Sequence, residues 1–141
     1  MVIFLWPVSM EKTVVIAEEK SQLAAKLDAW LEENGYRVKT VADIEGIFNT
    51  LNLRGAIPVL LVDDRIADRC VSEDIATIKE TFGDVPIIVA TDSNDPEKEK
   101  RVRKEGVFYY HIKGAGMDEL TTAISCAMKR AVELCWNVDH M

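Results

Sequence analysis

The sequence contains few cysteines, and they show no pattern that would form a redox or metal site. Its three cysteines, Cys70, Cys126 and Cys135, include no C-x-x-C motif and no metal-like pairing with either histidine. A widely spaced, odd set of this kind is typical of a reducing compartment, where buried cysteine acts as a small apolar side chain. We therefore expect a cytoplasmic protein whose cysteines have no redox role.

Long apolar runs are also missing. The run at residues 2–6 is too short to cross a bilayer, and it has neither the basic flank nor the small-residue cleavage site of a signal peptide. We interpret residues 1–9 as an N-terminal apolar extension. We expect it to pack on its own domain or on a second copy of the chain, near the last two helices.

Basic residues are outnumbered by acidic ones, 17 to 24, which gives a net charge of -7 at pH 7. Nucleic acids and anionic membranes would repel such a chain, so neither is expected as a partner. With 141 residues, 48% of them apolar, the chain is long enough for one domain with a substantial core. This domain is expected over residues 10–135, followed by a C-terminal tail at residues 136–141.

Short apolar runs alternate with amphipathic segments, which is the pattern of βα units around a parallel sheet. Strands are expected over residues 13–17, 36–41, 58–62, 86–91 and 107–112. Helices are expected after caps at Ser21, Asp43, Ser72 and Asp95, and over residues 117–134. The pattern predicts an α/β fold: a doubly wound, five-stranded parallel sheet of strand order 2-1-3-4-5 in a flavodoxin-like three-layer sandwich.

The predicted helix at residues 97–105 is almost wholly charged. Val102 is its only large apolar residue. A helix with so little to bury is expected to be short and loosely docked.

Polar residues that could carry chemistry stand at the ends of the predicted strands. They are Glu18, Glu19, Asp63, Asp64, Thr91 and Lys113. The carboxyl ends of parallel strands meet at one edge of the sheet, so these side chains are expected to converge there. Clustered carboxylates repel one another unless a cation intervenes, and a hard ion such as Mg²⁺ prefers oxygen ligands. Lys113 would offer a fixed positive charge to an anion brought to that metal.

Four segments together resemble the conserved blocks of response regulator receiver domains. They are residues 14–19, 59–63, 86–91 and 110–113, and the resemblance runs from about residue 11 to residue 130. It implies that Asp63 is the phosphoacceptor, that Thr91 and Lys113 bind the phosphoryl group, and that Tyr110 is the aromatic switch residue. It also implies an Mg²⁺ site formed by Glu18, Glu19, Asp63 and the backbone carbonyl of Arg65.

The function that this resemblance implies is signalling rather than enzymatic turnover. The chain would be a single-domain response regulator of a two-component system. A sensor histidine kinase or another phosphodonor would phosphorylate it, and it would act through a downstream partner protein, with a homodimer left open.

Some residues depart from the family's pattern. The acidic pair is Glu-Glu, residues 66–70 replace the usual proline-and-glycine loop, Gly114 follows Lys113, and Asp92 follows Thr91. The negative charges of Asp64 and Asp92 at the mouth of the site are expected to slow the approach of a dianionic phosphodonor.

Other interpretations remain open. Glu18 and Glu19 can be an ordinary acidic helix start, and Asp63 and Asp64 can be turn residues. At the level of function, the alternatives are a pseudo-receiver that binds proteins without phosphotransfer and a flavodoxin-like small-molecule binder. The second lacks a phosphate-binding loop rich in glycine, serine or threonine after the first strand.

Overall fold

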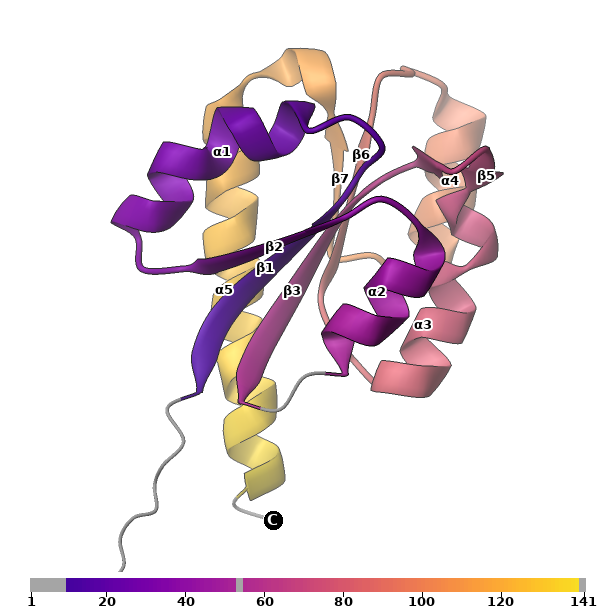
Figure 1. Cartoon of the computed structure of the whole chain (residues 1–141). Helices are drawn as coiled ribbons and strands as arrows, with labels where there is room; N and C mark the ends of the chain where they lie inside the picture. Colours follow the sequence, from indigo (N-terminus) through magenta and orange to yellow (C-terminus); the bar gives the residue numbers. More distant parts are fainter. Residues whose placement is uncertain (1–9, 53–54, 140–141) are drawn as a thin grey trace, which may run out of the picture.

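A central parallel sheet organises the protein. The computed structural model describes residues 10–52 and 55–139. Its sheet has the order β2-β1-β3-β6-β7, which confirms the predicted order and the α/β fold (Figure 1). The strands are β1 (Glu11–Ala17), β2 (Arg37–Val41), β3 (Ala56–Asp63), β6 (Ile87–Thr91) and β7 (Tyr109–Ile112).

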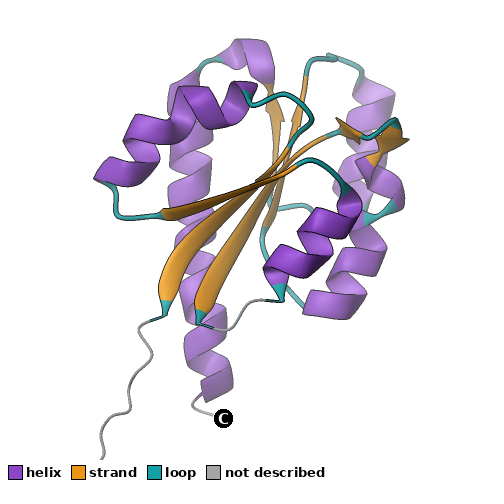
Figure 2. Cartoon of the chain, viewed as in Figure 1, coloured by secondary structure: helices purple, strands orange, loops and turns teal. Residues whose placement is uncertain are grey.

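Helices cover both faces of this sheet. Figure 2 shows α1 (Gln22–Glu33) and α5 (Met117–Asp139) on one face, and α2 (Ile44–Leu51), α3 (Ile75–Phe82) and α4 (Pro96–Lys104) on the other. The strand residues divide between the two layers by alternation. On β3, Val59 and Leu61 belong to the core under α1 and α5, whereas Leu60 and Val62 belong to the core under α2, α3 and α4. Among the described residues, no helix is long and apolar enough to cross a membrane.

Two of the predicted caps are confirmed, and a glycine follows the first helix. Asp43 accepts a hydrogen bond from the Gly46 N–H (2.8 Å) at the start of α2. Asp95 accepts from the Glu97 N–H (3.0 Å), with Pro96 as the first residue of α4. Gly35, just after α1, has φ +75°, a conformation that glycine adopts without a steric penalty.

Two predicted helix boundaries are wrong. A 3₁₀ turn occupies Val71–Glu73, so α3 begins at Ile75 rather than after a cap at Ser72. Helix α5 continues to Asp139 instead of ending at residue 134, because residues 135–138 contain no proline or glycine to stop it. Four of the six residues assigned to the C-terminal tail are therefore helical. The predicted extension at residues 1–9 lies outside the described residues.

The segment after Asp63 is a small hairpin rather than an open loop. Strands β4 (Arg65–Ile66) and β5 (Arg69–Cys70) pair antiparallel. The two residues between them, Ala67 and Asp68, have φ +50° and +61°. Two central residues with positive φ are the feature of the tight two-residue hairpin turns, which fit the twist of the flanking strands.

Candidate functional site

An ion pair joins the carboxyl ends of β3 and β7. The Lys113 Nζ lies 2.5 Å from Asp63 Oδ2, and the two side chains are only 15% and 19% exposed. The Arg65 N–H donates to the other carboxylate oxygen, Asp63 Oδ1, at 3.1 Å. Asp63 is therefore held in a fixed orientation at the edge of the sheet where the sequence predicts it.

Burial and charge both act on this pair. Burial raises the pKa of the Asp63 carboxyl, and the hydrogen bonds from Lys113 and the Arg65 backbone partly oppose that rise. Burial also tends to lower the pKa of Lys113. The contacts with Asp63, together with the charges of Asp92 and Glu18, outweigh that effect, so the pKa of Lys113 is raised.

Asp64 belongs to a second, neighbouring polar cluster, and its side chain adds to the rise that burial causes in the pKa of the Asp63 carboxyl. Asp64 is 5% exposed, accepts a hydrogen bond from Thr91 Oγ1 at 2.8 Å, and forms an ion pair with Lys98 of α4. Thr91 is fully buried and its oxygen accepts from the Ser93 N–H at 3.0 Å. The pKa of Lys98 is raised, chiefly by its hydrogen bond to Asp64.

This cluster corrects two expectations. Asp64 is not a free negative charge at the mouth of the site, because it is buried and neutralised by Lys98. Helix α4 is also not held by Val102 alone, since Lys98 adds a second buried contact. Lys98 lies four residues before Val102 and so on the same helical face. That spacing is the sequence signal that could have identified it.

The pleat of the strands explains why the polar residues separate into two groups. Asp63 follows the alternation of Val59 and Leu61, on the face of α1 and α5. Asp64 follows Leu60 and Val62, on the face of α4. Position at the strand ends brings Asp63 to Lys113. The face of the pleat on which Thr91 lies brings its hydroxyl to Asp64 instead.

Glu18 caps helix α1. Its two carboxylate oxygens accept hydrogen bonds from the N–H groups of Leu23 (3.0 Å) and Ala24 (2.9 Å), and the residue is 7% exposed. Ser21 occupies the N-cap position but makes no side-chain capping bond, so the predicted Ser21 cap is wrong. The carboxylate takes over because two oxygens can satisfy two unpaired N–H groups and complement the helix dipole.

The remaining predicted residues lie around these two clusters. Tyr110 is buried beside Thr91, Asp64 and Lys98, and its burial raises the pKa of its hydroxyl. The Arg103 guanidinium lies 5.8 Å from the centre of the Tyr110 ring. Asp92 is exposed, and its Oδ2 lies 3.7 Å from Lys113 Nζ, so it does stand at the mouth of the Asp63 site.

The oxygen atoms near Asp63 are the possible ligands of the predicted Mg²⁺ site. As the side chains stand, the described residues contain no group of three or more His, Cys, Asp or Glu that could hold a metal ion. Asp63 and the exposed Glu19 supply carboxylates at this edge. The Val71 N–H donates to the Asp64 carbonyl (2.8 Å), so the next pair of the hairpin, Arg65 with Cys70, is a non-hydrogen-bonded pair. In such a pair the backbone groups face away from the partner strand, and the Arg65 carbonyl therefore points away from the hairpin. The carboxylates of Asp63 and Glu19 and the Arg65 carbonyl would supply only oxygen ligands, which fits a weakly held, hydrated Mg²⁺.

The fold and the half-buried Asp63–Lys113 pair together define a receiver-type signalling domain. The family model of the response regulator receiver domain matches residues 14–125. The chain therefore belongs to the response regulator receiver family, whose members act in two-component signalling.

Solved structures agree with this assignment, and a comparison with curated proteins gave no match. The beryllofluoride-activated NtrC4 receiver domain dimer is 22% identical, with a TM-score of 0.75 over 84% of this chain and 98% of that one. A receiver domain protein from Clostridium thermocellum is 23% identical, with a TM-score of 0.73 over 87% and 98%. The signal receiver domain of a modulated diguanylate cyclase from Desulfovibrio desulfuricans G20 is 27% identical, with a TM-score of 0.68 over 84% and 94%.

Proposed function

We propose that this receiver domain accepts a phosphoryl group on Asp63 and passes the signal to a partner protein. The contact between Lys113 Nζ and Asp63 Oδ2 is the observation that carries the proposal. It places a fixed positive charge within hydrogen-bonding distance of the nucleophile, where a phosphoryl group would arrive. A sensor histidine kinase or another phosphodonor and a cytoplasmic location belong to the same proposal.

The chemistry uses one oxygen of Asp63. That oxygen forms a bond to phosphorus while the bond between phosphorus and the donor's leaving nitrogen or oxygen breaks, and the leaving atom keeps the electron pair. The Lys113 ammonium would change its ion-pair partner from the Asp63 carboxylate to the phosphoryl oxygens, since it can pair with either anion. Thr91 would donate to a second phosphoryl oxygen only after releasing Asp64, because a hydroxyl has one proton to donate.

The proposal includes an Mg²⁺ site. Asp63, Glu19 and the Arg65 carbonyl would bind the ion directly, and Glu18 would bind it through a water molecule. When bound, Mg²⁺ would neutralise charge on the phosphoryl oxygens. The capping role of Glu18 favours a water-mediated contact over a direct one, because both its oxygens already accept backbone N–H groups.

Intact-mass measurement after incubation with acetyl phosphate tests the proposal, in Mg²⁺ and in a chelator. We expect one added phosphoryl group on the wild type in Mg²⁺ and none on Asp63→Asn, which keeps the shape of the side chain. Asp64→Asn is the matched control and retains labelling. Labelling of Asp63→Asn would refute the assignment of the phosphoacceptor.

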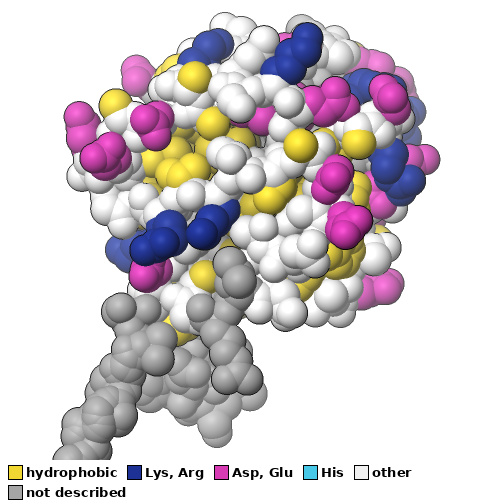
Figure 3. Space-filling view, in the orientation of Figure 1, with side chains coloured by type: hydrophobic (Ala, Val, Ile, Leu, Met, Phe, Trp, Pro, Cys, Tyr) yellow, Lys and Arg dark blue, Asp and Glu magenta, His cyan; other side chains and the backbone are white. Residues whose placement is uncertain are grey.

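The pseudo-receiver is the second candidate, and specific contacts favour it. The Thr91 hydroxyl donates its hydrogen bond to Asp64, and Glu18 is occupied by α1, so two of the predicted site residues are engaged elsewhere. In this case the wild type stays unlabelled, and the surface alone mediates binding. Figure 3 shows acidic and basic side chains interspersed over one face, which suits a partner with mixed charge. The flavodoxin-like alternative stays a prediction that a flavin absorbance spectrum would test.

A further inference from the structure

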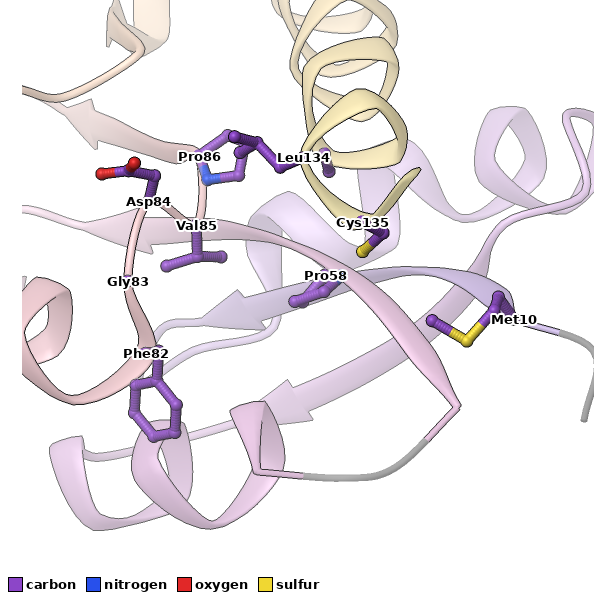
Figure 4. A pocket seen from close by; sticks show the side chains of 10 residues that line it. Met10, Pro58, Phe82, Gly83, Asp84, Val85, Pro86, Leu134 and Cys135 are labelled. Atoms are coloured by element: carbon purple, nitrogen blue, oxygen red, sulfur yellow. The ribbon is translucent and has the colours of Figure 1, made fainter. Parts of the chain in front are cut away.

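An apolar pocket lies at the amino ends of β3 and β6, on the edge of the sheet opposite Asp63. Its volume is about 470 Å³, and its walls include Met10, Pro58, Phe82, Val85, Leu134 and Cys135 (Figure 4). Among the described residues that line it, Asp84 alone carries a charge. A pocket of this size and character is suited to apolar side chains.

The start of β1 lies beside this pocket. Met10 is the first described residue, it lines the pocket, and it is 45% exposed. It is one of only two exposed large apolar side chains in the described part of the chain, the other being Phe108. An exposed methionine beside an apolar pocket marks a surface that a further apolar group would cover.

The sequence supplies such a group within reach. Residues 2–6 read Val-Ile-Phe-Leu-Trp, and Trp6 is four residues from Met10. Four extended residues span at most about 14 Å, so Trp6 is tethered close to a pocket that has Met10 in its wall. A tether this short gives an effective concentration in the millimolar range. A second copy would lack that advantage and would meet the repulsion of two chains of net charge -7.

We propose that the apolar segment at residues 2–6 binds in this pocket of its own chain as an intramolecular arm, with Trp6 as its anchor. The occupied pocket would join the start of the chain to the α3–β6 connection and to the C-terminal part of α5. The proposal does not depend on phosphotransfer, because the pocket and Asp63 lie at opposite edges of the sheet.

Disulfide trapping tests the arm, since Cys135 already lies in the pocket wall. The full chain carries Trp6→Cys in a background of Cys70→Ser and Cys126→Ser. The matched control carries Trp6→Cys with Cys126 retained and Cys135→Ser, which moves the native thiol to an exposed site nine residues earlier on α5. Under mild oxidation we expect the Cys135 version to form an intramolecular disulfide at least tenfold faster. Equal rates, or a disulfide between two chains, would overturn the proposal.

Thermal unfolding provides a readout without cysteine chemistry. Trp6→Ala is expected to lower the Tm of the wild type and to have no further effect in a Leu134→Asp background, because the charge already prevents docking. If Leu134→Asp fails to fold, Met10→Asp replaces it, because Met10 lines the same pocket and is 45% exposed. Equal Tm values for the wild type and Trp6→Ala would refute a docked arm.

Discussion

The buried ion pair between Asp64 and Lys98 is expected to contribute strongly to the free energy of unfolding. Their side chains are 6% and 19% exposed. Lys98→Met keeps the apolar stem of the lysine but leaves the Asp64 carboxylate buried without its cation. Breaking a fully buried pair costs about 3–5 kcal/mol. Because Lys98 is partly solvated, we expect a loss of about 2–3 kcal/mol in the free energy of unfolding.

Asp64→Asn is the complementary variant. It removes the charge but keeps an oxygen that accepts from Thr91 Oγ1, so it isolates the ion pair from the hydrogen bond. Lys98 can move towards solvent when it loses its partner, which limits the expected loss to about 1 kcal/mol. The double variant has neither charge buried, and we expect it to lose about 1 kcal/mol as well. It is then less destabilised than the sum of the single variants by about 2–3 kcal/mol.

Urea unfolding of the wild type and the three variants measures this coupling. Lys100→Met, at an exposed position of the same helix, is the matched control and is expected to change stability by less than about 0.5 kcal/mol. Unchanged m-values would show that the denatured state is not responsible. Strictly additive single effects would refute the pair, and α4 would then be held by Val102 alone.

Three further predictions concern other residues. Asp92→Asn is expected to speed acetyl-phosphate labelling by less than about tenfold, because Asp92 is exposed and its charge near Lys113 is screened by salt; a slower variant in a labelling time course would contradict this. Glu18→Ala is expected to lose about 1–2 kcal/mol through the α1 cap, and Ser21→Ala much less, in denaturant unfolding; equal losses would contradict the assigned cap. Burial lowers the pKa of His111, so the unfolded state binds more protons and stability falls as the pH drops below about 6.5. His111→Phe is expected to flatten the dependence of Tm on pH between about 5 and 7, and an unchanged slope would mean that other groups cause it.

The sheet could be predicted from the sequence because its strands are apolar runs punctuated by glycine, proline and caps. Uninterrupted apolar runs identify β3 and β6, since both strands are buried on two faces. Helix ends are less secure. The start of α3 and the end of α5 depend on local hydrogen bonds and on the absence of a stop signal, which propensity describes poorly.

The candidate site could be predicted only to the level of the strand end. The position of Asp63 opposite Lys113 follows from parallel strands, and the structure places them in contact. The engagement of Thr91 by Asp64 does not follow, because it depends on which face of the pleat each side chain takes and on a lysine 34 positions further along. The sequence allows two interpretations of Glu18, as a metal ligand or as an acidic helix start. The geometry of α1 decides between them, because both carboxylate oxygens point to its N–H groups.

The hairpin after Asp63 lowers the conformational entropy that binding a ligand beside Asp63 would cost. Ordering an open loop costs about 1–2 kcal/mol for each residue that becomes fixed. The pairing of β4 with β5 has already fixed the backbone beside Asp63, so a ligand that uses the Arg65 carbonyl would pay little of this cost. The same rigidity prevents the backbone from adapting to a larger ion. An ion bound beside Asp63 would therefore be selected by its size.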